Sequence, residues 1–503
     1  MRFFMFVSLV LVLMMGILMA GGIVTNTNQS AAYMRTLNRN ASTDVDAVYF
    51  NPAGLTALED GLHLSLSNQS IWQTKTVNND YANLSNNEFV GDVVAPLFPN
   101  LYIAYKSGKL ALSAGFEPIG GGGSAVFEDG LPSFEIPVSN LKTSLGVSDY
   151  SFDTKFEGSS IYFGGQVGIS YAINNMISVG VGARYVMASN SYLGHMKDIM
   201  VNSAVGWTTP VQYLEVVVAQ FQSASASLQS IIDAGAGGST LSDLQAGGYL
   251  TAEEYAQLAG GLTSLGVTDP GSYTAAVAQA TYDGAATSTQ AQIPYVQAAT
   301  ADVEVDAKQT GSGISPVVSL FLTPGENLGI AMRYEMKTPL ELENDTKEDG
   351  TGLFPDGAKT SADMPAMFAL GVSYKAMKKL RAEFDLNYYF NEGVDWDGKE
   401  DYIENGYEAG LAVEYCLNEK MRASVGFLNA KGGAKEDYQT DMSYSLNSNT
   451  IGFGFAYKLA DNILLNVGAL NTFYGDDEKN TDTYKETYKK TTFGFAFGID
   501  YKF

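Results

Sequence analysis

The C-terminal stretch of the chain, residues 493–503, alternates strictly between two kinds of side chain. Successive side chains of a β-strand point to opposite faces, so the stretch predicts a strand with one apolar face and one small or polar face. The apolar positions are Phe493, Phe495, Phe497, Ile499, Tyr501 and Phe503, and the others are Gly494, Ala496, Gly498, Asp500 and Lys502. An unbroken row of aromatic side chains suits contact with lipid or with a core.

Composition excludes several classes of protein. The chain has 503 residues and a formal net charge of −25, with 17% charged and 12% aromatic residues. This is too apolar for a disordered chain and too acidic for a nucleic-acid partner. After residue 20 no apolar run reaches the roughly 18 residues of a membrane-spanning helix. Cys416 has no disulfide partner, and His63 and His195 do not make a metal site. We expect no cofactor.

The N-terminus has the layout of a secretory signal peptide, predicted over residues 1–20. Arg2 gives a positive start, an apolar run follows, and Ala20, Gly21 and Gly22 are small residues suited to cleavage. The alternative is an uncleaved anchor helix.

Alternating or apolar-rich strand candidates recur through the rest of the chain. They number about 14, and an even count is what a single-chain bacterial barrel requires. The candidates are residues 61–76, 97–106, 109–127, 156–171, 177–194, 303–322, 327–343, 363–375, 379–391, 404–417, 421–432, 445–458, 462–475 and 489–503.

Short and long connections between these strands alternate. Residues 107–108, 173–176, 323–326, 376–378, 418–420 and 459–461 are short links, whereas 77–96, 128–155, 195–302, 344–362 and the acidic stretches around Asp395, Glu436 and Asp477 are long. Outer-membrane barrels have short periplasmic turns and long outer loops. The pattern predicts an all-β fold, a transmembrane antiparallel barrel over residues 61–503. In residues 379–391, the charges of Arg381, Glu383 and Asp385 are then expected to face the lumen.

Two segments do not have the sequence pattern of barrel strands. Residues 21–60 are polar and Asn-rich, and are long enough to fold back as a plug inside the lumen. Residues 195–302 form an insertion with helical apolar spacing, a capping-box pattern at Thr251 and Glu254, and a helix start at Asp269-Pro270. We predict a partly helical extracellular insertion whose apolar faces either pack together or hold a ligand.

Together these features resemble the FadL family, the outer-membrane channels for long-chain fatty acids and hydrophobic compounds of Gram-negative bacteria. The residues that carry the resemblance are Asn51-Pro52-Ala53 after the Gly21-Gly22 start, with the stretches 311–316, 329–337 and 364–374. The insertion matches by position and helical character only. Tyr501 and Phe503 resemble the C-terminal signal by which the barrel assembly machinery recognises such proteins.

The resemblance implies a 14-stranded barrel closed by an N-terminal hatch that contains Asn51, Pro52 and Ala53. It implies passive transport, in which outer loops capture the substrate and a kinked third strand releases it sideways into the membrane. Here the kink would be formed by Pro118, Gly120, Gly121, Gly122 and Gly123, because proline lacks the ladder donor and glycine marks bulges. The alternative is an ordinary loop tip.

A substrate carboxylate would need a cation, and the expected candidates are Arg184, Arg333 and Lys337 on lumen faces. Each is alternatively a structural ion-pair member. Because the outer loops are acidic and would repel a free carboxylate, a neutral hydrophobic substrate is a second possibility.

Three other functions compete with transport: an outer-membrane enzyme, a general diffusion porin and an adhesin. No nucleophile and base are arranged for catalysis, so we expect no enzyme. A general porin would leave the lumen open, and an adhesin would use the insertion as its binding head.

Overall fold

The computed structural model describes residues 30–503, so the predicted signal peptide and the Gly21-Gly22 start lie outside the described residues. The chain divides into two compact units. One contains Pro137–Asp153 and Met196–Asp302, and the other contains 30–136, Thr154–His195 and Val303–Phe503.

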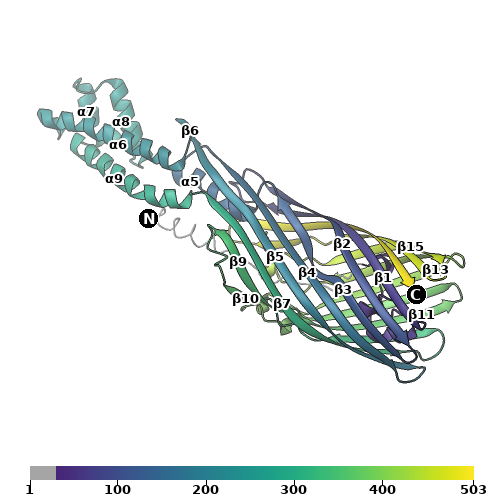
Figure 1. Ribbon diagram of the computed structural model, residues 1–503. Helices are drawn as coiled ribbons and strands as arrows, with labels where there is room; N and C mark the ends of the chain where they lie inside the picture. The colour runs from purple at the N-terminus through teal and green to yellow at the C-terminus, as the bar shows by residue number, and fades with distance from the viewer. Residues whose placement is uncertain (1–29) are drawn as a thin grey trace. The chain divides into compact units, whose positions relative to one another are not determined.

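The larger unit is a closed antiparallel β-barrel of 14 strands (Figure 1). Its wall strands are β1 (Gly61–Asn79), β2 (Glu88–Ser107), β3 (Leu110–Phe127), β4 (Asp149–Ala172), β5 (Ile177–Ser203), β7 (Val303–Leu322), β8 (Leu328–Glu335), β11 (Ala366–Met377), β12 (Leu380–Phe390), β13 (Gly406–Cys416), β14 (Met421–Lys431), β15 (Ser448–Ala460), β16 (Ile463–Tyr474) and β18 (Lys485–Lys502). Additional strands are β6 (Gly206–Thr208), β9 (Glu341–Asp349), β10 (Lys359–Ser361) and β17 (Asp477–Asn480). The wall closes where β1 pairs with β18, from His63 opposite Lys502 to Asn79 opposite Glu486.

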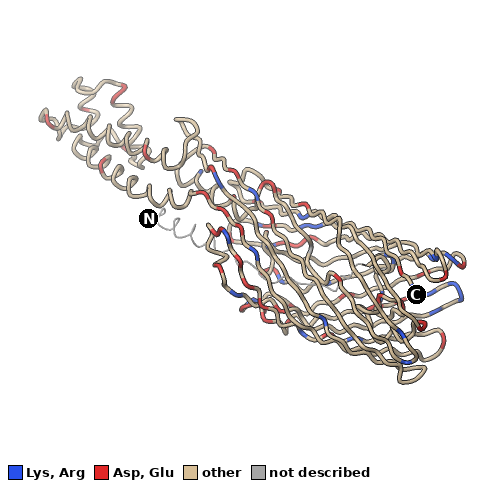
Figure 2. Tube along the Cα trace, viewed as in Figure 1, with Lys and Arg blue, Asp and Glu red and all other residues tan. Residues whose placement is uncertain are grey.

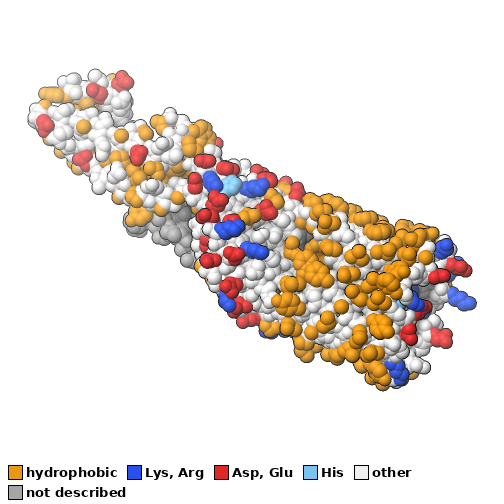
Figure 3. Space-filling view, in the orientation of Figure 1, with side chains coloured by type: hydrophobic (Ala, Val, Ile, Leu, Met, Phe, Trp, Pro, Cys, Tyr) orange, Lys and Arg blue, Asp and Glu red, His pale blue; other side chains and the backbone are white. Residues whose placement is uncertain are grey.

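The two faces of the wall differ as the alternation predicts. In β18, Phe493, Phe495 and Phe497 are exposed, whereas Gly494 and Ala496 are buried. On the face shown in Figure 3, apolar side chains cover the middle of the barrel wall and charged side chains gather toward its two ends. The positions of the charged residues along the chain are marked in Figure 2. In β12 the charged Glu383 and Asp385 point inward and are buried, while Phe384 and Tyr388 point outward. The predicted lumen orientation of these two acidic residues is confirmed.

Several strands extend further than the sequence predicts. β2 begins at Glu88 rather than at residue 97, β4 begins at Asp149 rather than at 156, and β5 continues to Ser203 rather than ending at 194. Beyond the apolar belt a strand has no need of one apolar face, so the alternation that marks it in the sequence fades there.

Two connections also differ from expectation. The predicted loop 128–155 contains two short helices, α4 (Pro132–Ser139) and α5 (Leu141–Leu145), before β4 begins. The predicted strand 327–343 is divided into β8 and β9 by residues 336–340, which keep only an isolated bridge between Thr338 and Met364 and contain Pro339, a residue with no backbone donor for a ladder.

The smaller unit is mainly helical. Between Met196 and Asp302 its helices are α6 (Pro210–Ile231), η2 (Ile232–Ala236), α7 (Leu241–Ala246), α8 (Ala252–Ser264), η3 (Pro270–Ser272) and α9 (Ala275–Ala299). Its apolar faces pack against one another in a core that includes Leu228, Leu244, Leu262 and Tyr282. None of the helices in residues 30–503 has both the length and the apolarity needed to cross a bilayer.

Helix starts in this unit follow local sequence rules. Thr251 and Glu254 form a capping box on α8. The backbone N–H of Thr251 donates to Glu254 Oε2 at 2.8 Å, and this hydrogen bond lowers the pKa of the carboxyl group. The predicted helix start at Asp269-Pro270 opens only the short helix η3. The long helix α9 begins later, and Thr274 is its N-cap.

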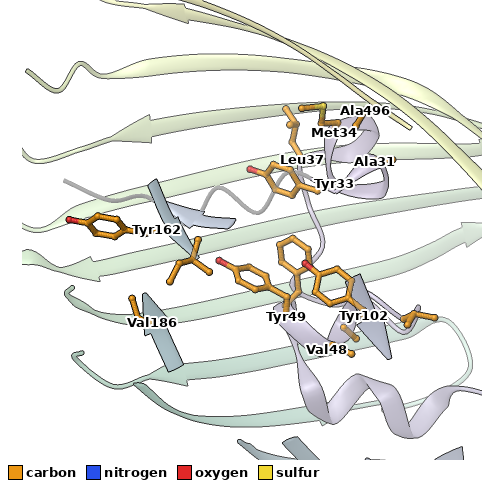
Figure 4. Packing of buried hydrophobic residues seen from close by; sticks show 14 of the residues in the cluster. Ala31, Tyr33, Met34, Leu37, Val48, Tyr49, Tyr102, Tyr162, Val186 and Ala496 are labelled. Atoms are coloured by element: carbon orange, nitrogen blue, oxygen red, sulfur yellow. The ribbon is translucent and has the colours of Figure 1, made fainter. Parts of the chain in front are cut away.

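The interior of the barrel is occupied by residues 30–60, which we call the lumen segment. It forms the short helices α2 (Ala31–Thr36), α3 (Ala47–Phe50) and η1 (Pro52–Ala57). Met34 and Tyr49 of this segment pack with Tyr102 and Tyr162 of the wall in one buried cluster (Figure 4). The segment therefore supplies a large part of the core that the barrel encloses.

Glycines on the inward face of the wall let the lumen segment approach closely. A Cβ atom added at Gly426 would lie 1.8 Å from the backbone oxygen of Thr36, and one at Gly452 would lie 2.5 Å from that of Met34. One at Gly371 would lie 2.5 Å from the backbone nitrogen of Ala41. The small face of these strands thus accommodates another stretch of backbone, which cannot move aside as a side chain can.

We predict that Gly426→Val destabilises the folded protein by about 1–3 kcal/mol, the usual range for overpacking a filled interior. The measurement is the temperature at which the compact, heat-modifiable form of the barrel is lost on a gel. Gly165→Val is the matched control, because no atom lies within 4 Å of the Cβ position at Gly165. Equal melting temperatures for the two variants would contradict the close-packing argument.

Candidate functional site

The Asn51-Pro52-Ala53 motif is held against the barrel wall by hydrogen bonds. The backbone N–H of Ala53 donates to Ser319 Oγ at 3.0 Å, and Ser170 Oγ donates to the backbone oxygen of Pro52 at 2.7 Å. The side chain of Asn51 is buried, and its amide atoms have no hydrogen-bond partner among the described residues. The motif thus joins the lumen segment to β4 and β7.

Two arginines of the lumen segment, which sequence reasoning missed, hold it in place. Arg35 pairs with Glu414 of β13 and donates from Nε to Asn466 at 3.1 Å. Arg39 pairs with Asp46 at 2.7 Å. On β12, Asp385 accepts backbone hydrogen bonds from Arg39 at 2.6 Å and from the next residue at 2.8 Å. Arginines in a segment predicted to fill the lumen were the available signal, since a buried guanidinium needs several partners.

Arg184 and Arg333 lie deep in the interior around one aromatic ring. The guanidinium carbons lie 4.6 Å and 5.1 Å from the centre of the Tyr49 ring, within range of a cation–π interaction. Arg184 also pairs with Glu335 at 2.5 Å and with Glu117 at 3.4 Å, and Arg333 donates to the backbone oxygen of Tyr49. Both arginines therefore have protein partners.

Lys337, the third predicted cation, pairs with Asp363 at 2.7 Å and is 41% exposed. None of the three predicted cations belongs to the lining of the cavity described next. Their contact with a ligand carboxylate stays a prediction.

A cavity of about 310 Å³ lies between the lumen segment and the wall. This volume is at the lower end of the range for small-molecule pockets. Tyr33 and Leu37 of the lumen segment line it. The other lining residues are Ile71, Gln73, Lys75, Ala95, Phe98, Pro118, Gly120, Gly121, Gly123, Ser160, Tyr162, Glu408, Leu428, Ala430, Gly432, Tyr438, Ser443, Tyr444, Ser445, Leu446, Ser448, Thr450, Leu470, Thr472, Tyr474, Lys490 and Thr492.

Four of the five predicted kink residues of β3, Pro118, Gly120, Gly121 and Gly123, border this cavity at a break in the sheet. Pairing between β2 and β3 stops after Val93 opposite Ala125 and resumes only at Leu101 opposite Phe116. We call this unpaired stretch the ladder gap. On the other side of β3, the register with β4 shifts between Pro118 and Gly120 and again between Gly121 and Gly123. Gly121 and Gly123 have φ angles of 89° and 79°, which side chains other than glycine rarely adopt.

Three prolines explain the ladder gap. Pro96 and Pro99 lie on the β2 side and Pro118 on the β3 side, and none of them can donate a ladder hydrogen bond. Phe98 lies on the same stretch, and its ring is 6.1 Å from that of Phe163. Sequence reasoning found only the β3 half of this arrangement, because Pro96 falls at the end of the predicted loop 77–96 and Pro99 lies within the predicted strand 97–106, where it was not read as a break.

The last residues of the chain close the wall. The backbone N–H of Phe503 donates to the backbone oxygen of Leu62 at 2.9 Å. The rings of Tyr501 and Phe503 meet edge to face with centres 4.5 Å apart. Recognition of these residues by an assembly machinery stays a prediction.

Within 30–503, no group of three His, Cys, Asp or Glu side chains is arranged to hold a metal ion.

Solved structures resemble this barrel over nearly its whole length. A Pseudomonas aeruginosa FadL homologue has 11% sequence identity and a TM-score of 0.60, and the match covers 96% of this chain and 100% of that one. The chain has the FadL-type fold. The P. putida toluene transporter TodX, another FadL-type barrel, has 14% identity and a TM-score of 0.52, with 92% of this chain and 95% of that chain covered. No protein-family model matches the sequence, and no curated protein matches it either.

We predict that Arg184→Gln destabilises this FadL-type barrel by about 3–5 kcal/mol, because it leaves the buried carboxylates of Glu117 and Glu335 without their cation. Lys337→Gln is the matched control and is expected to cost about 0–1 kcal/mol, since its ion pair is partly exposed. Thermal unfolding of the purified proteins measures both changes. A stable Arg184→Gln variant would argue against a structural role for this arginine.

Proposed function

We propose that this protein is an outer-membrane channel that moves hydrophobic small molecules passively across the outer membrane. The observation that carries the proposal is the cavity, whose lining runs from the lumen segment to the ladder gap. A cavity inside a wall with an apolar outer surface gives such a molecule a place to leave water before it enters lipid.

Release is proposed to be lateral, through the ladder gap into the membrane. The lumen segment fills the interior with buried residues, which disfavours a straight path along the barrel axis. Ala95 and Phe98 of β2 and Pro118 of β3 reach the cavity from the two sides of the gap. Transfer of an acyl chain out of water gains about 0.8 kcal/mol per CH₂ group, so the movement needs no energy source.

The similarity in fold to a toluene transporter and to a FadL homologue supports this substrate class. Both long-chain fatty acids and small hydrocarbons remain within it. The proposal includes outer-membrane lipid around the apolar belt, and barrel assembly guided by Tyr501 and Phe503.

The filled lumen also bears on the alternatives. A general porin would need an open aqueous lumen, whereas residues such as Met34, Tyr49 and Phe50 are almost wholly buried there. For an adhesin, the helical unit would have to present a binding face; many of its apolar residues form its own core, while Tyr249, Val277 and Tyr295 are exposed.

The test is uptake of labelled long-chain fatty acid and of labelled toluene by cells that lack their own channels for these compounds. We expect Ala95→Trp to lower the initial uptake rate at least about tenfold, because an indole at this position would fill the cavity beside the ladder gap. Val94→Trp is the matched control, since Val94 is the neighbouring residue and is 62% exposed on the outer face.

Both variants must first be shown to be folded and present in the membrane at native levels. Equal uptake by the two variants would argue against exit at this gap. Absence of uptake of either compound by the unaltered protein would argue against the proposed function itself.

A further inference from the structure

Two lysines face each other across the seam at which the barrel closes. Lys75 of β1 is directly opposite Lys490 of β18 in the antiparallel register. Both line the cavity. Directly opposed residues have Cβ atoms about 5 Å apart, and like charges in this position repel each other.

Neither lysine has an acidic partner among residues 30–503 that would offset this repulsion. Other lysines of the barrel do have one, such as Lys485 with Glu478 at 3.0 Å and Lys502 with Glu59. Glu408, the acidic residue of the cavity lining, is already bound: it accepts hydrogen bonds from Asn387 at 3.0 Å and from Tyr389 at 2.7 Å. The pair thus presents positive charge to the cavity in a strongly acidic protein.

Tyrosine rings flank the two ammonium groups. Lys75 Nζ lies 5.8 Å from the centre of the Tyr444 ring, and Lys490 Nζ lies 5.0 Å from that of the Tyr474 ring. The hydroxyl of Tyr444 donates to the backbone oxygen of Lys489 at 2.8 Å, which fixes the ring beside β18. Cation–π contacts of this kind hold the lysine side chains in the cavity wall but do not neutralise their charge.

The rest of the lining is divided between polar and apolar groups. Thr450, Thr472 and Thr492 supply hydroxyl groups. Apolar side chains come from the lumen segment and from the β2 side of the ladder gap, including Leu37 and Phe98. A ligand with one anionic end and an apolar body would match both parts, whereas a neutral hydrocarbon would leave the two charges without a counterion.

We propose that Lys75 and Lys490 form an anion-binding subsite of the cavity, which selects apolar molecules that carry a carboxylate over neutral molecules of the same length. The carboxylate lies between the two ammonium groups and turns their mutual repulsion into attraction to a shared anion. This inference rests on the proposed function, because it describes which hydrophobic molecules the cavity prefers.

The experiment compares oleic acid with oleyl alcohol, which has the same chain and a neutral head. The dissociation constants of both are measured with the purified full-length protein, and uptake of both is measured in cells. We expect the double variant Lys75→Gln/Lys490→Gln to bind oleate about ten- to a hundredfold more weakly, the effect of losing a charge-assisted contact, while its affinity for oleyl alcohol stays near that of the unaltered protein.

Lys489→Gln is the matched control, because Lys489 is the preceding residue of β18 and is exposed on the other face. It should leave both affinities unchanged. Native oleate affinity in the folded double variant would overturn the subsite. An equal loss of affinity for both ligands would also overturn it, because the lysines would then not distinguish a carboxylate from a hydroxyl group.

Failure of the proposed function gives a different result. In that case the unaltered protein binds neither ligand and supports uptake of neither, which overturns the subsite as well. If the unaltered protein and the double variant both bind and transport the two ligands equally, the proposed channel function is supported and only the anion-binding subsite is overturned.

Discussion

Backbone hydrogen bonding is the constraint on which this structure depends. A wall with an apolar outer surface cannot leave N–H and C=O groups unpaired toward lipid, so the sheet must close on itself, and β1 pairs with β18 to do so. The ladder gap between β2 and β3 is a local departure from this rule. It occurs where three prolines have no donor to offer, and where the wall borders a cavity rather than a packed interior.

The interior follows from the same wall. Because alternate residues of each strand face inward, the side of the strand that must not meet lipid is free to be small or charged. Glycines such as Gly426 and Gly452 accommodate the backbone of the lumen segment, and acidic residues such as Glu414 and Asp385 bind its arginines and backbone N–H groups. The inward face of the wall therefore both packs closely against the lumen segment and pairs with its polar groups.

Much of this fold could be predicted from the sequence, because the alternation of residues 493–503 and the alternation of short and long links are local signals. The outer extensions of β2, β4 and β5 could not, since nothing outside the apolar belt forces a strand to alternate. The ion pair of Arg35 with Glu414 was missed for another reason, because it joins residues that come together only when the barrel encloses the lumen segment.

The pairing of the two cavity lysines could be predicted from the sequence only in part. Parity along β1 and β18 alone puts Lys75 and Lys490 on inward faces, since they alternate with outward aromatic residues such as Trp72 and Phe493. Only the register of the closing seam makes them direct neighbours. Register between the first and last strands is a property of the closed barrel and has no local signal in either strand.

The hydrogen bonds of the lumen segment have a consequence for the closure of the barrel. This segment precedes β1 in the chain, yet it is tied to β4 and β7 through Pro52 and Ala53 and to β12 and β13 through Asp385 and Glu414. These contacts lie inside the wall that the seam between β1 and β18 closes. The native contacts of the N-terminal segment and the closure of the barrel are therefore coupled, because the enclosed segment contacts strands from both halves of the wall.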